Sequence, residues 1–165
     1  TKYTQNCIRW KKKEELIYEI SANIDDMSSE IYSYLYEKIL DEKALDIYTE
    51  SIYMKKNRPA TKVSILCNES DLEKFIKILL LETSTFGVRY NAYNREILER
   101  KFVKLDTKYG VVTVKLGYYK GKLVKATPEY NECKTIAKNE DIPIKKVFAD
   151  INFRIKEEFS ENLLT

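Results

Sequence analysis

Two adjacent aspartates, Asp25 and Asp26, are the first residues of the chain whose types and spacing suit a chemical role. They follow a segment of strand-like alternation and directly precede an expected helix. Paired carboxylates at such a turn can hold a hard divalent cation, with phosphate oxygens completing its coordination shell. The alternative is that the two acids cap the helix that follows and complement its dipole.

A basic run, Lys55-Lys56-Asn57-Arg58, lies between two expected strands and ends at Pro59. Arginine offers a forked donor for phosphate and the lysines add point charges, so this run can neutralise a polyphosphate. A solvated turn between two strands has the same composition, and this alternative stays open.

A hydroxyl-rich segment follows an apolar helix and contains Thr83, Ser84, Thr85, Gly87 and Arg89. Hydroxyls and backbone N–H groups can donate together to an anion, and the arginine adds a positive charge. The segment lacks the glycine and lysine pattern of a P-loop. It is equally typical of a helix C-terminus followed by a polar turn.

Glu129 and Tyr130 fall in the first turn of an expected helix that Thr127-Pro128 introduces. A helix N-terminus attracts anions, but acids in the first turn oppose phosphate binding unless a cation bridges them. Taken alone, Glu129 therefore indicates dipole complementation. Tyr130 can stack on a nucleobase or simply pack against the protein.

The composition narrows the chemistry further, because none of the 165 residues is histidine. This excludes serine–histidine and cysteine–histidine nucleophile pairs and imidazole metal sites within the chain. The charge balance of 29 basic against 26 acidic residues is unlike that of a general nucleic-acid binder. With the polar clusters above, the composition favours binding of a metal–nucleoside triphosphate over hydrolysis by a nucleophilic side chain.

The cysteines and the apolar runs indicate the compartment. Cys7, Cys67 and Cys133 are widely spaced and form no C-x-x-C pair, which is typical of a reducing cytoplasm. The longest nearly pure apolar run, 75–81, is interrupted by Lys77 and is too short to span a bilayer. We expect a cytoplasmic protein with neither a membrane nor a nucleic-acid partner.

Residues 14–93 are expected to form a ferredoxin-like subdomain with the order β-α-β-β-α-β. Its strands are predicted at 14–22, with Leu16, Tyr18 and Ile20 on one face, and at 44–54, 61–67 and 86–93.

The two helices of this subdomain carry clear signals. Ser28 is expected to cap the first helix, and Ser70 with Glu73 forms a capping box for the second. Their predicted buried stripes are Ile31, Leu35 and Ile39 in the first, and Leu72, Phe75, Ile76, Leu79 and Leu80 in the second.

Residues 94–165 are expected to form a β-meander followed by two helices, so the fold class is α+β. The predicted strands span 96–105, 111–119 and 123–126, with turns at Tyr109-Gly110 and Lys120-Gly121. One helix is expected to begin at Thr127-Pro128 and the other at Pro143. Residues 1–13 are interpreted as a polar linker or frayed N-terminus.

Five segments of the chain resemble the LarC nickel-insertion proteins, in that family's order and over roughly residues 19–150. They are NIDDM at 23–27, MKKNRP at 54–59, ETSTFGVR at 82–89, Tyr109-Gly110, and PEYNEC at 128–133. The resemblance is to the C-terminal part of LarC, so we expect this chain to be part of a larger enzyme. The family usually has glutamate and threonine where this chain has Ser21 and Ala22.

The resemblance implies an activity. LarC proteins insert Ni²⁺ into pyridinium-3,5-bisthiocarboxylic acid mononucleotide, which yields the nickel-pincer nucleotide of lactate racemase. The reaction is that of a CTP-dependent cyclometallase of the lyase class, and Mn²⁺ supports it. The C-terminal part binds CTP and assembles into trimers or hexamers, and CTP donates a CMP group to the substrate. The implied partners are thus CTP, the mononucleotide and the N-terminal LarC portion.

The resemblance also implies roles for the polar clusters. Asp25 and Asp26 would hold Mn²⁺ or Mg²⁺ against the triphosphate of CTP. The expected catalytic groups, which would stabilise charge on the departing pyrophosphate, are Lys55, Lys56 and Arg58. The other expected nucleotide-binding residues are Asn57, which would read the cytosine edge or fix the loop, Thr83, Ser84, Thr85, Arg89, Glu129 and Tyr130.

Two other classes of function share features with this sequence. A ferredoxin-like module could bind a small anion or its own copies without turnover. An RNA-recognition domain shares the strand and helix order, but it needs stacking aromatics on its central strands, and residues 62–67 contain none.

Overall fold

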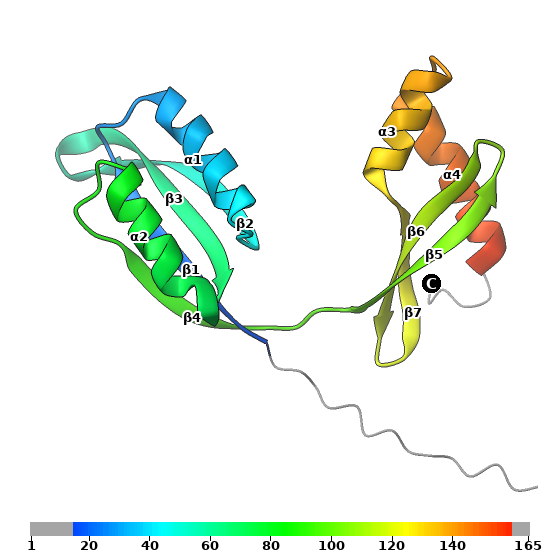
Figure 1. The fold of residues 1–165 in the computed structure, drawn as a ribbon, viewed down its shortest axis with the longest axis horizontal. Helices are drawn as coiled ribbons and strands as arrows, with labels where there is room; N and C mark the ends of the chain where they lie inside the picture. Colours follow the sequence, from blue (N-terminus) through cyan, green and yellow to red (C-terminus); the bar gives the residue numbers. More distant parts are fainter. Residues whose placement is uncertain (1–14, 160–165) are drawn as a thin grey trace, which may run out of the picture. The chain divides into compact units, whose positions relative to one another are not determined.

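The computed structural model describes residues 15–159, and these form two compact units. The first unit ends at Glu96 and the second begins at Ile97. Each unit combines one antiparallel sheet with two helices (Figure 1). The linker expected at 1–13 lies outside the described residues.

The first unit has the predicted order of elements, β-α-β-β-α-β. They are β1 (Glu15–Ile24), α1 (Ser29–Asp41), β2 (Asp46–Met54), β3 (Arg58–Asn68), α2 (Leu72–Glu82) and β4 (Arg89–Arg95). The strands lie in the order β2-β3-β1-β4, and all neighbours are antiparallel. This is the ferredoxin-like arrangement, and α1 and α2 cover the same face of the sheet (Figure 1).

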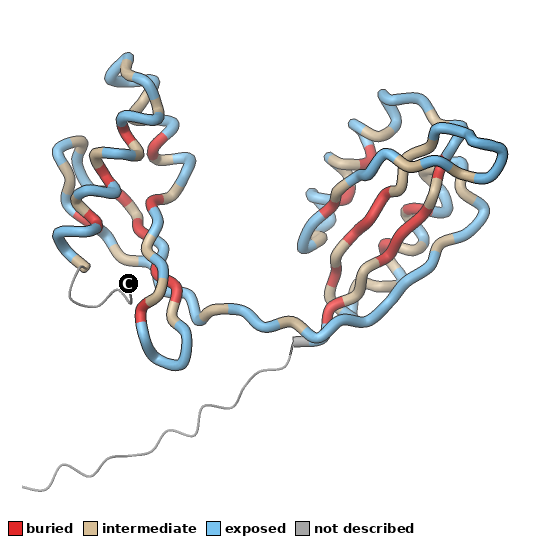
Figure 2. Tube along the Cα trace, turned by 180° about the vertical axis from the view of Figure 1, so that it is seen from behind, coloured by how far each residue is buried: buried red, intermediate tan, exposed pale blue. Residues whose placement is uncertain are grey.

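The core of the first unit lies between that face and the two helices (Figure 2). Alternate residues of β1 enter it, because side chains in a strand point to opposite faces in turn. The buried residues are Ile20, Ala22 and Ile24 of β1, Leu35 and Ile39 of α1, Ile47 of β2, Val63, Ile65 and Cys67 of β3, and Phe75 and Leu79 of α2. Three residues predicted on the buried faces are instead exposed by 40 % or slightly more: Leu16, Ile31 and Leu80.

The helix caps differ from the predicted ones. Ser28 occupies the N-cap of α1, but its hydroxyl makes no capping bond, and the Ile31 N–H donates to the Ser28 carbonyl at 3.2 Å. The prediction of a capping box formed by Ser70 and Glu73 is wrong. Ser70 lies in a 3₁₀ turn, Glu69–Asp71, which precedes α2, and no side chain caps that helix.

The second unit is the predicted β-meander followed by two helices. Its strands are β5 (Glu99–Thr107), β6 (Gly110–Tyr119) and β7 (Lys122–Pro128), in the sheet order β5-β6-β7, and its helices are α3 (Tyr130–Asn139) and α4 (Ile144–Phe159). A second core joins Leu105, Val112, Val114, Leu116 and Leu123 of the sheet to Cys133 of α3 and Val147, Ile151 and Ile155 of α4 (Figure 2).

The helix start expected at Thr127-Pro128 is wrong by two residues. Thr127 and Pro128 still belong to β7, where Pro128 lies opposite Val114. Proline is tolerated there because β7 is an edge strand. The Glu129 N–H donates to the Thr113 carbonyl at 2.9 Å, so strand pairing delays the helix until Tyr130.

The third difference concerns β4, which begins at Arg89 and not at Phe86. The Phe86 side chain is fully exposed in the loop after α2.

Within residues 15–159, no helix combines the length and the apolar composition that crossing a bilayer requires.

Candidate functional site

Three of the polar clusters singled out in the sequence meet at one end of the first sheet. Strand β1 ends at Ile24, directly before the paired aspartates. Because β3 and β4 run antiparallel to β1, both begin at this same end, with Thr61 opposite Ile24 and Arg89 opposite Ser21. Segments separated by as many as 66 residues therefore lie around one end of β1.

The aspartates contact two of the other segments directly. Arg58 Nη1 lies 3.3 Å from Asp25 Oδ2, and the Ser84 hydroxyl donates to Asp26 Oδ1 at 2.5 Å. The Arg58 and Asp25 side chains retain 57 % and 25 % of their exposure, so solvent screens this ion pair. A weak pair of this kind can be replaced when a cation approaches the carboxylate and a phosphate approaches the guanidinium.

Arg89 is held by Asn23, a residue that the sequence analysis did not assign to the site. Arg89 Nη2 donates to Asn23 Oδ1 at 2.8 Å. Asn23 lies two residues before Asp25 in the same motif, and this was the available signal. The contact directs the Arg89 guanidinium toward the end of β1 where the aspartates lie.

The hydroxyls of the loop after α2 have different surroundings. Thr83 Oγ1 donates to the Leu79 carbonyl at 2.6 Å and closes the C-terminus of α2. Thr85 Oγ1 donates to the Gly87 carbonyl at 2.9 Å. Both threonines thus shape the loop, as the alternative interpretation of a polar turn expects, while Ser84 contacts Asp26.

The basic turn between β2 and β3 is exposed and conformationally strained. Lys55–Asn57 form a single 3₁₀ turn, and Lys56 and Asn57 have φ of 61° and 54°. Positive φ is costly for residues other than glycine, although asparagine tolerates it better. Within the described residues, Lys55 and Lys56 have no hydrogen-bond or ion-pair partner, so both ammonium groups are available to an anion.

A cleft of about 410 Å³ opens beside Asp25 in this unit. It is bordered by the loop between β1 and α1 and by the facing ends of β2 and β3. Its lining residues are Ile24, Asp25, Met27, Tyr32, Ser51, Ile52, Tyr53, Pro59, Ala60 and Thr61. The cleft thus adjoins the cluster through Asp25, which contributes to both.

The donor set around Asp25 and Asp26 fits a cation that phosphates help to bind. Within residues 15–159, no three carboxylate or thiolate side chains are grouped so that they could hold a metal ion by themselves. Mg²⁺ and similar hard cations are commonly held by one or two carboxylates together with substrate phosphates. The two aspartates match this second arrangement.

Glu129 and Tyr130 belong to the second unit, outside this cluster. Glu129 is the N-cap residue of α3 and lies 3.7 Å from Lys115, and Tyr130 is exposed. The neighbouring Glu132 accepts the Thr113 N–H and hydroxyl at 2.5 and 2.6 Å. These hydrogen bonds lower the pKa of Glu132. Glu132 is therefore a structural acid that binds Thr113 of β6 just beyond the last pair between β6 and β7.

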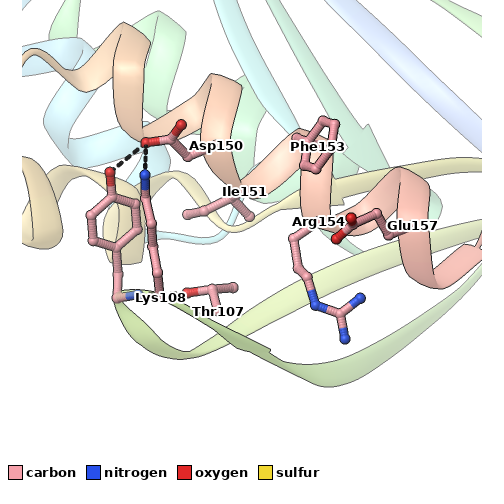
Figure 3. Close-up of a pocket in the computed structure, with 8 residues that line it drawn as sticks. Thr107, Lys108, Asp150, Ile151, Phe153, Arg154 and Glu157 are labelled. Carbon is pink, nitrogen blue, oxygen red and sulfur yellow. Dashed lines mark hydrogen bonds and ion pairs between the residues drawn. The ribbon is translucent and has the colours of Figure 1, made fainter.

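The Tyr109-Gly110 motif anchors α4. Asp150 of α4 accepts the Tyr109 hydroxyl at 2.6 Å and pairs with Lys108 Nζ at 2.7 Å (Figure 3). Hydrogen bonds from Lys108 and Tyr109 lower the pKa of Asp150. A hollow of about 220 Å³ lies beside them, and the charges at this end of it are already paired. We interpret this motif as structural.

The two departures from the family pattern lie on β1. Ala22 is 1 % exposed and packs in the core, and Ser21 is buried on the sheet face that lacks helices. On that face the Tyr48 hydroxyl donates to Glu19 at 3.1 Å, and Lys62 lies 3.8 Å from the same carboxylate. Burial would raise the pKa of Glu19, but these partners outweigh it and lower the pKa.

Comparison with known proteins shows which family the sequence matches. The sequence profile of the family described as nickel insertion protein matches residues 4–148. The pyridinium-3,5-bisthiocarboxylic acid mononucleotide nickel insertion protein of Clostridium kluyveri is 44 % identical over 137 residues, which are 83 % of this chain and 34 % of that protein. Its counterpart in Thermotoga petrophila is 37 % identical over 145 residues, which are 88 % of this chain and 36 % of that protein. The chain thus spans about a third of the length of these relatives.

Two solved structures share the fold. One is LarC2, described as the C-terminal domain of a cyclometallase involved in the synthesis of the NPN cofactor of lactate racemase, in its apo form. It is 36 % identical, with a TM-score of 0.82 over 86 % of this chain and 98 % of that domain. The other, protein MK0293 from Methanopyrus kandleri, is 22 % identical, with a TM-score of 0.66 over 82 % of this chain and 84 % of that one, and shows the fold alone.

Proposed function

Because the chain belongs to the nickel insertion protein family, we propose that it is the CTP-binding part of a nickel insertase. The complete enzyme would act on pyridinium-3,5-bisthiocarboxylic acid mononucleotide, the compound in the names of its relatives. Nickel is the inserted metal and CTP the consumed nucleotide. The observation that carries this proposal is the meeting of the carboxylate, cationic and hydroxyl clusters at one end of the first sheet.

The carboxylates would hold the cation that accompanies the triphosphate. Asp25 is within reach of Arg58 and Asp26 accepts from Ser84, so each carboxylate is already oriented without being deeply buried. Bound Mn²⁺ or Mg²⁺ would supply positive charge to the phosphate oxygens. When Asp25 turns to the cation, Arg58 loses its internal partner and becomes free for phosphate.

The cations of the β2–β3 turn would bind the phosphates and act in catalysis. Lys55 and Lys56 have no partner in the part of the chain that the structure describes, and Arg58 can offer its fork to two phosphate oxygens. Transfer of CMP to the substrate forms a bond to the α-phosphorus of CTP and breaks its bond to pyrophosphate. The three cations would stabilise the charge that develops on that leaving group.

The remaining residues of the first unit would position the nucleotide. Ser84, from the loop after α2, and Arg89, from the start of β4, would donate to phosphate or ribose oxygens. Thr83 and Thr85 maintain the shape of that loop. Asn57 carries both a donor and an acceptor and would read the cytosine edge or fix the turn. Glu129 and Tyr130 remain proposed nucleotide contacts from the second unit.

Nickel itself would be held by other groups. The described residues contain no grouped carboxylates and thiolates that could bind it alone. The sulfur atoms of the substrate and the N-terminal portion of LarC would supply the ligands. We further propose that the chain acts in the cytoplasm as a homotrimer or hexamer, as the family resemblance implies.

Calorimetric titration of CTP into the protein, with and without Mn²⁺, tests the site. Lys55→Ala and Arg58→Ala should each weaken binding of CTP with Mn²⁺ by roughly 10- to 150-fold, since hydrogen bonds to charged groups contribute about 1.5–3 kcal/mol. Lys77→Ala is the matched control, because Lys77 is an exposed lysine of α2 with no hydrogen-bond or ion-pair partner among residues 15–159. Equal affinities in all three variants would overturn the phosphate assignment.

A non-catalytic anion-binding module is the alternative, favoured by the internal pairing of Arg58 and Arg89 in the cluster. Pyrophosphate release separates the two functions. Addition of CTP, Mn²⁺, nickel and the mononucleotide to the chain together with its N-terminal portion should release pyrophosphate. Binding of CTP without any release under these conditions would favour the module.

A further inference from the structure

The cleft beside Asp25 has a lining that the phosphate chemistry leaves unexplained. Seven of its ten lining residues are apolar or aromatic, and only Asp25, Ser51 and Thr61 bring polar side chains. A cleft of about 410 Å³ lies within the usual size range of small-molecule sites, which are mostly apolar with a few placed polar groups.

The aromatic wall of this cleft lies on the hairpin that carries the basic turn. Tyr53 lies opposite Pro59 in the β2–β3 pairing, and 74 % of its surface is exposed. Tyr32 of α1 and Met27 of the β1–α1 loop also line the cleft. A tyrosine side chain held beside a hollow offers a flat π-face on which a planar ring can stack.

The polar groups connect this cleft to the phosphate cluster. Asp25 lines the cleft and also lies 3.3 Å from Arg58. Tyr53 precedes Lys55 by two residues in the chain, so the flat ring and the free ammonium belong to one short segment. A ligand whose ring occupies the cleft can therefore place its phosphates at the basic turn.

We propose that this cleft binds the six-membered nitrogen heterocycle of a nucleotide and that Tyr53 stacks on that ring. The inference rests on the proposed function, which places the phosphates of a nucleotide at the turn. Two rings have this chemistry: the cytosine of CTP and the pyridinium ring of the mononucleotide substrate. With Asp25 engaged by the cation, the hydroxyls of Ser51 and Thr61 are the lining groups that can hydrogen-bond the edge of either ring, since a hydroxyl both donates and accepts.

Calorimetric titrations with three probes in the presence of Mn²⁺ test this assignment. CTP carries cytosine, nicotinamide mononucleotide carries a pyridinium ring, and inorganic tripolyphosphate carries no ring. The variants are Tyr53→Ala and Tyr53→Phe, with Tyr34→Ala as the control. Tyr34 is an exposed tyrosine on α1 that does not line the cleft.

Tyr53→Ala should weaken binding of the probe whose ring occupies the cleft by about 5- to 150-fold, the effect of removing one stacking aromatic. Tyr53→Phe should bind as the parent does, and tripolyphosphate should bind both variants equally well. A loss with CTP identifies cytosine as the occupant, and a loss with nicotinamide mononucleotide identifies the pyridinium ring. Unchanged affinities of Tyr53→Ala for both ring-bearing probes would overturn the inference.

A second measurement needs no variant. Saturation-transfer NMR on the unaltered protein should show strong transfer from protein aromatic protons to the ring protons of the bound probe. Transfer to ribose protons alone would overturn the ring assignment while leaving the proposed function intact. Failure of the unaltered protein to bind either CTP or tripolyphosphate would refute the proposed function and this inference with it.

Discussion

The strained turn at Lys56 gives a prediction in which neighbouring residues respond with opposite signs. Lys56 has φ 61° and ψ 24°, in the left-handed region, whereas Lys55 does not have positive φ. The left-handed conformation costs a residue with a Cβ about 1–2 kcal/mol, and glycine adopts it freely. Glycine also loses about 0.5–1 kcal/mol more conformational entropy on folding than alanine does.

These magnitudes fix the expected stabilities. Lys56→Gly should be more stable than Lys56→Ala by roughly 0.5–1 kcal/mol, because relief of strain exceeds the entropy term. At Lys55 the order should reverse, with the alanine variant more stable by about 0.5–1 kcal/mol. The glycine–alanine difference in unfolding free energy at Lys56 minus the same difference at Lys55 cancels the unfolded-state entropy of glycine. What remains is the cost of the left-handed conformation at Lys56, about 1–2 kcal/mol.

Urea unfolding followed by NMR is the suitable assay, because the two units of the chain can unfold separately. The amide signals of Ile20 and Val63 report on the core of the first unit. With an m-value of about 1 kcal/mol/M, the two Lys56 variants should differ in midpoint by roughly 0.5–1 M urea.

The same variants separate strain from charge. Lys56→Ala and Lys56→Gly both remove the ammonium group, so they should lose the same affinity for CTP while differing in stability. If Lys56→Gly is no more stable than Lys56→Ala, or if both positions show the same order, the argument from strain is refuted.

Three further predictions concern the rest of the chain. Burial raises the pKa of the Cys67 thiol to about 11; the folded protein should therefore leave Cys67 unmodified by iodoacetamide at pH 8, and peptide mass spectrometry should detect modification only in denaturant. Hydrogen bonds from Lys108 and Tyr109 hold the pKa of Asp150 in the folded protein below its ordinary value of 3.8. The ionised Asp150 therefore stabilises the fold above pH 3.8, and this stabilisation is lost as the pH falls through the folded pKa. The stability of Asp150→Asn should accordingly depend less steeply on pH in acid unfolding. A Cβ on Gly117 would lie 2.9 Å from Leu98 Cδ1, the end of a flexible side chain. Gly117→Ala should therefore destabilise the second unit by about 0.5–1 kcal/mol, the cost of displacing that side chain from its rotamer. In the Leu98→Ala background the same substitution should cost nothing measurable.

Acidic and basic residues are unevenly divided between the two units, although the net charge of the whole chain is small. Residues 15–96 carry ten basic and fifteen acidic side chains, whereas residues 97–159 carry fourteen basic and nine acidic ones. The proposed triphosphate site therefore lies in an acidic unit. Its attraction for phosphate must come from nearby groups such as Lys55, Lys56 and Arg58, and not from the general field of that unit.

The element order and much of the core could be predicted from the sequence. Alternation in β1 placed Tyr18 and Ile20 on one face, and helical spacing placed Leu35, Ile39, Phe75 and Leu79 inside. Such patterns follow from the fixed periods of strands and helices, which any stretch of chain carries by itself. The same patterns predicted that Leu16, Ile31 and Leu80 are buried, but these residues are exposed. Burial at the margin of a packed face depends on how far the neighbouring elements extend, which periodicity does not show.

Boundaries and the site depended on contacts that local sequence does not encode. Pro128 continues β7 because β6 lies beside it. Ser70 lies in a 3₁₀ turn and therefore does not cap α2 as expected. The individual clusters at Asp25, Lys55 and Ser84 were visible in the sequence as residue types, each with a plain alternative. Antiparallel pairing around β1 decided that they share one end of a sheet, since register and strand order bring together residues that are far apart in the chain.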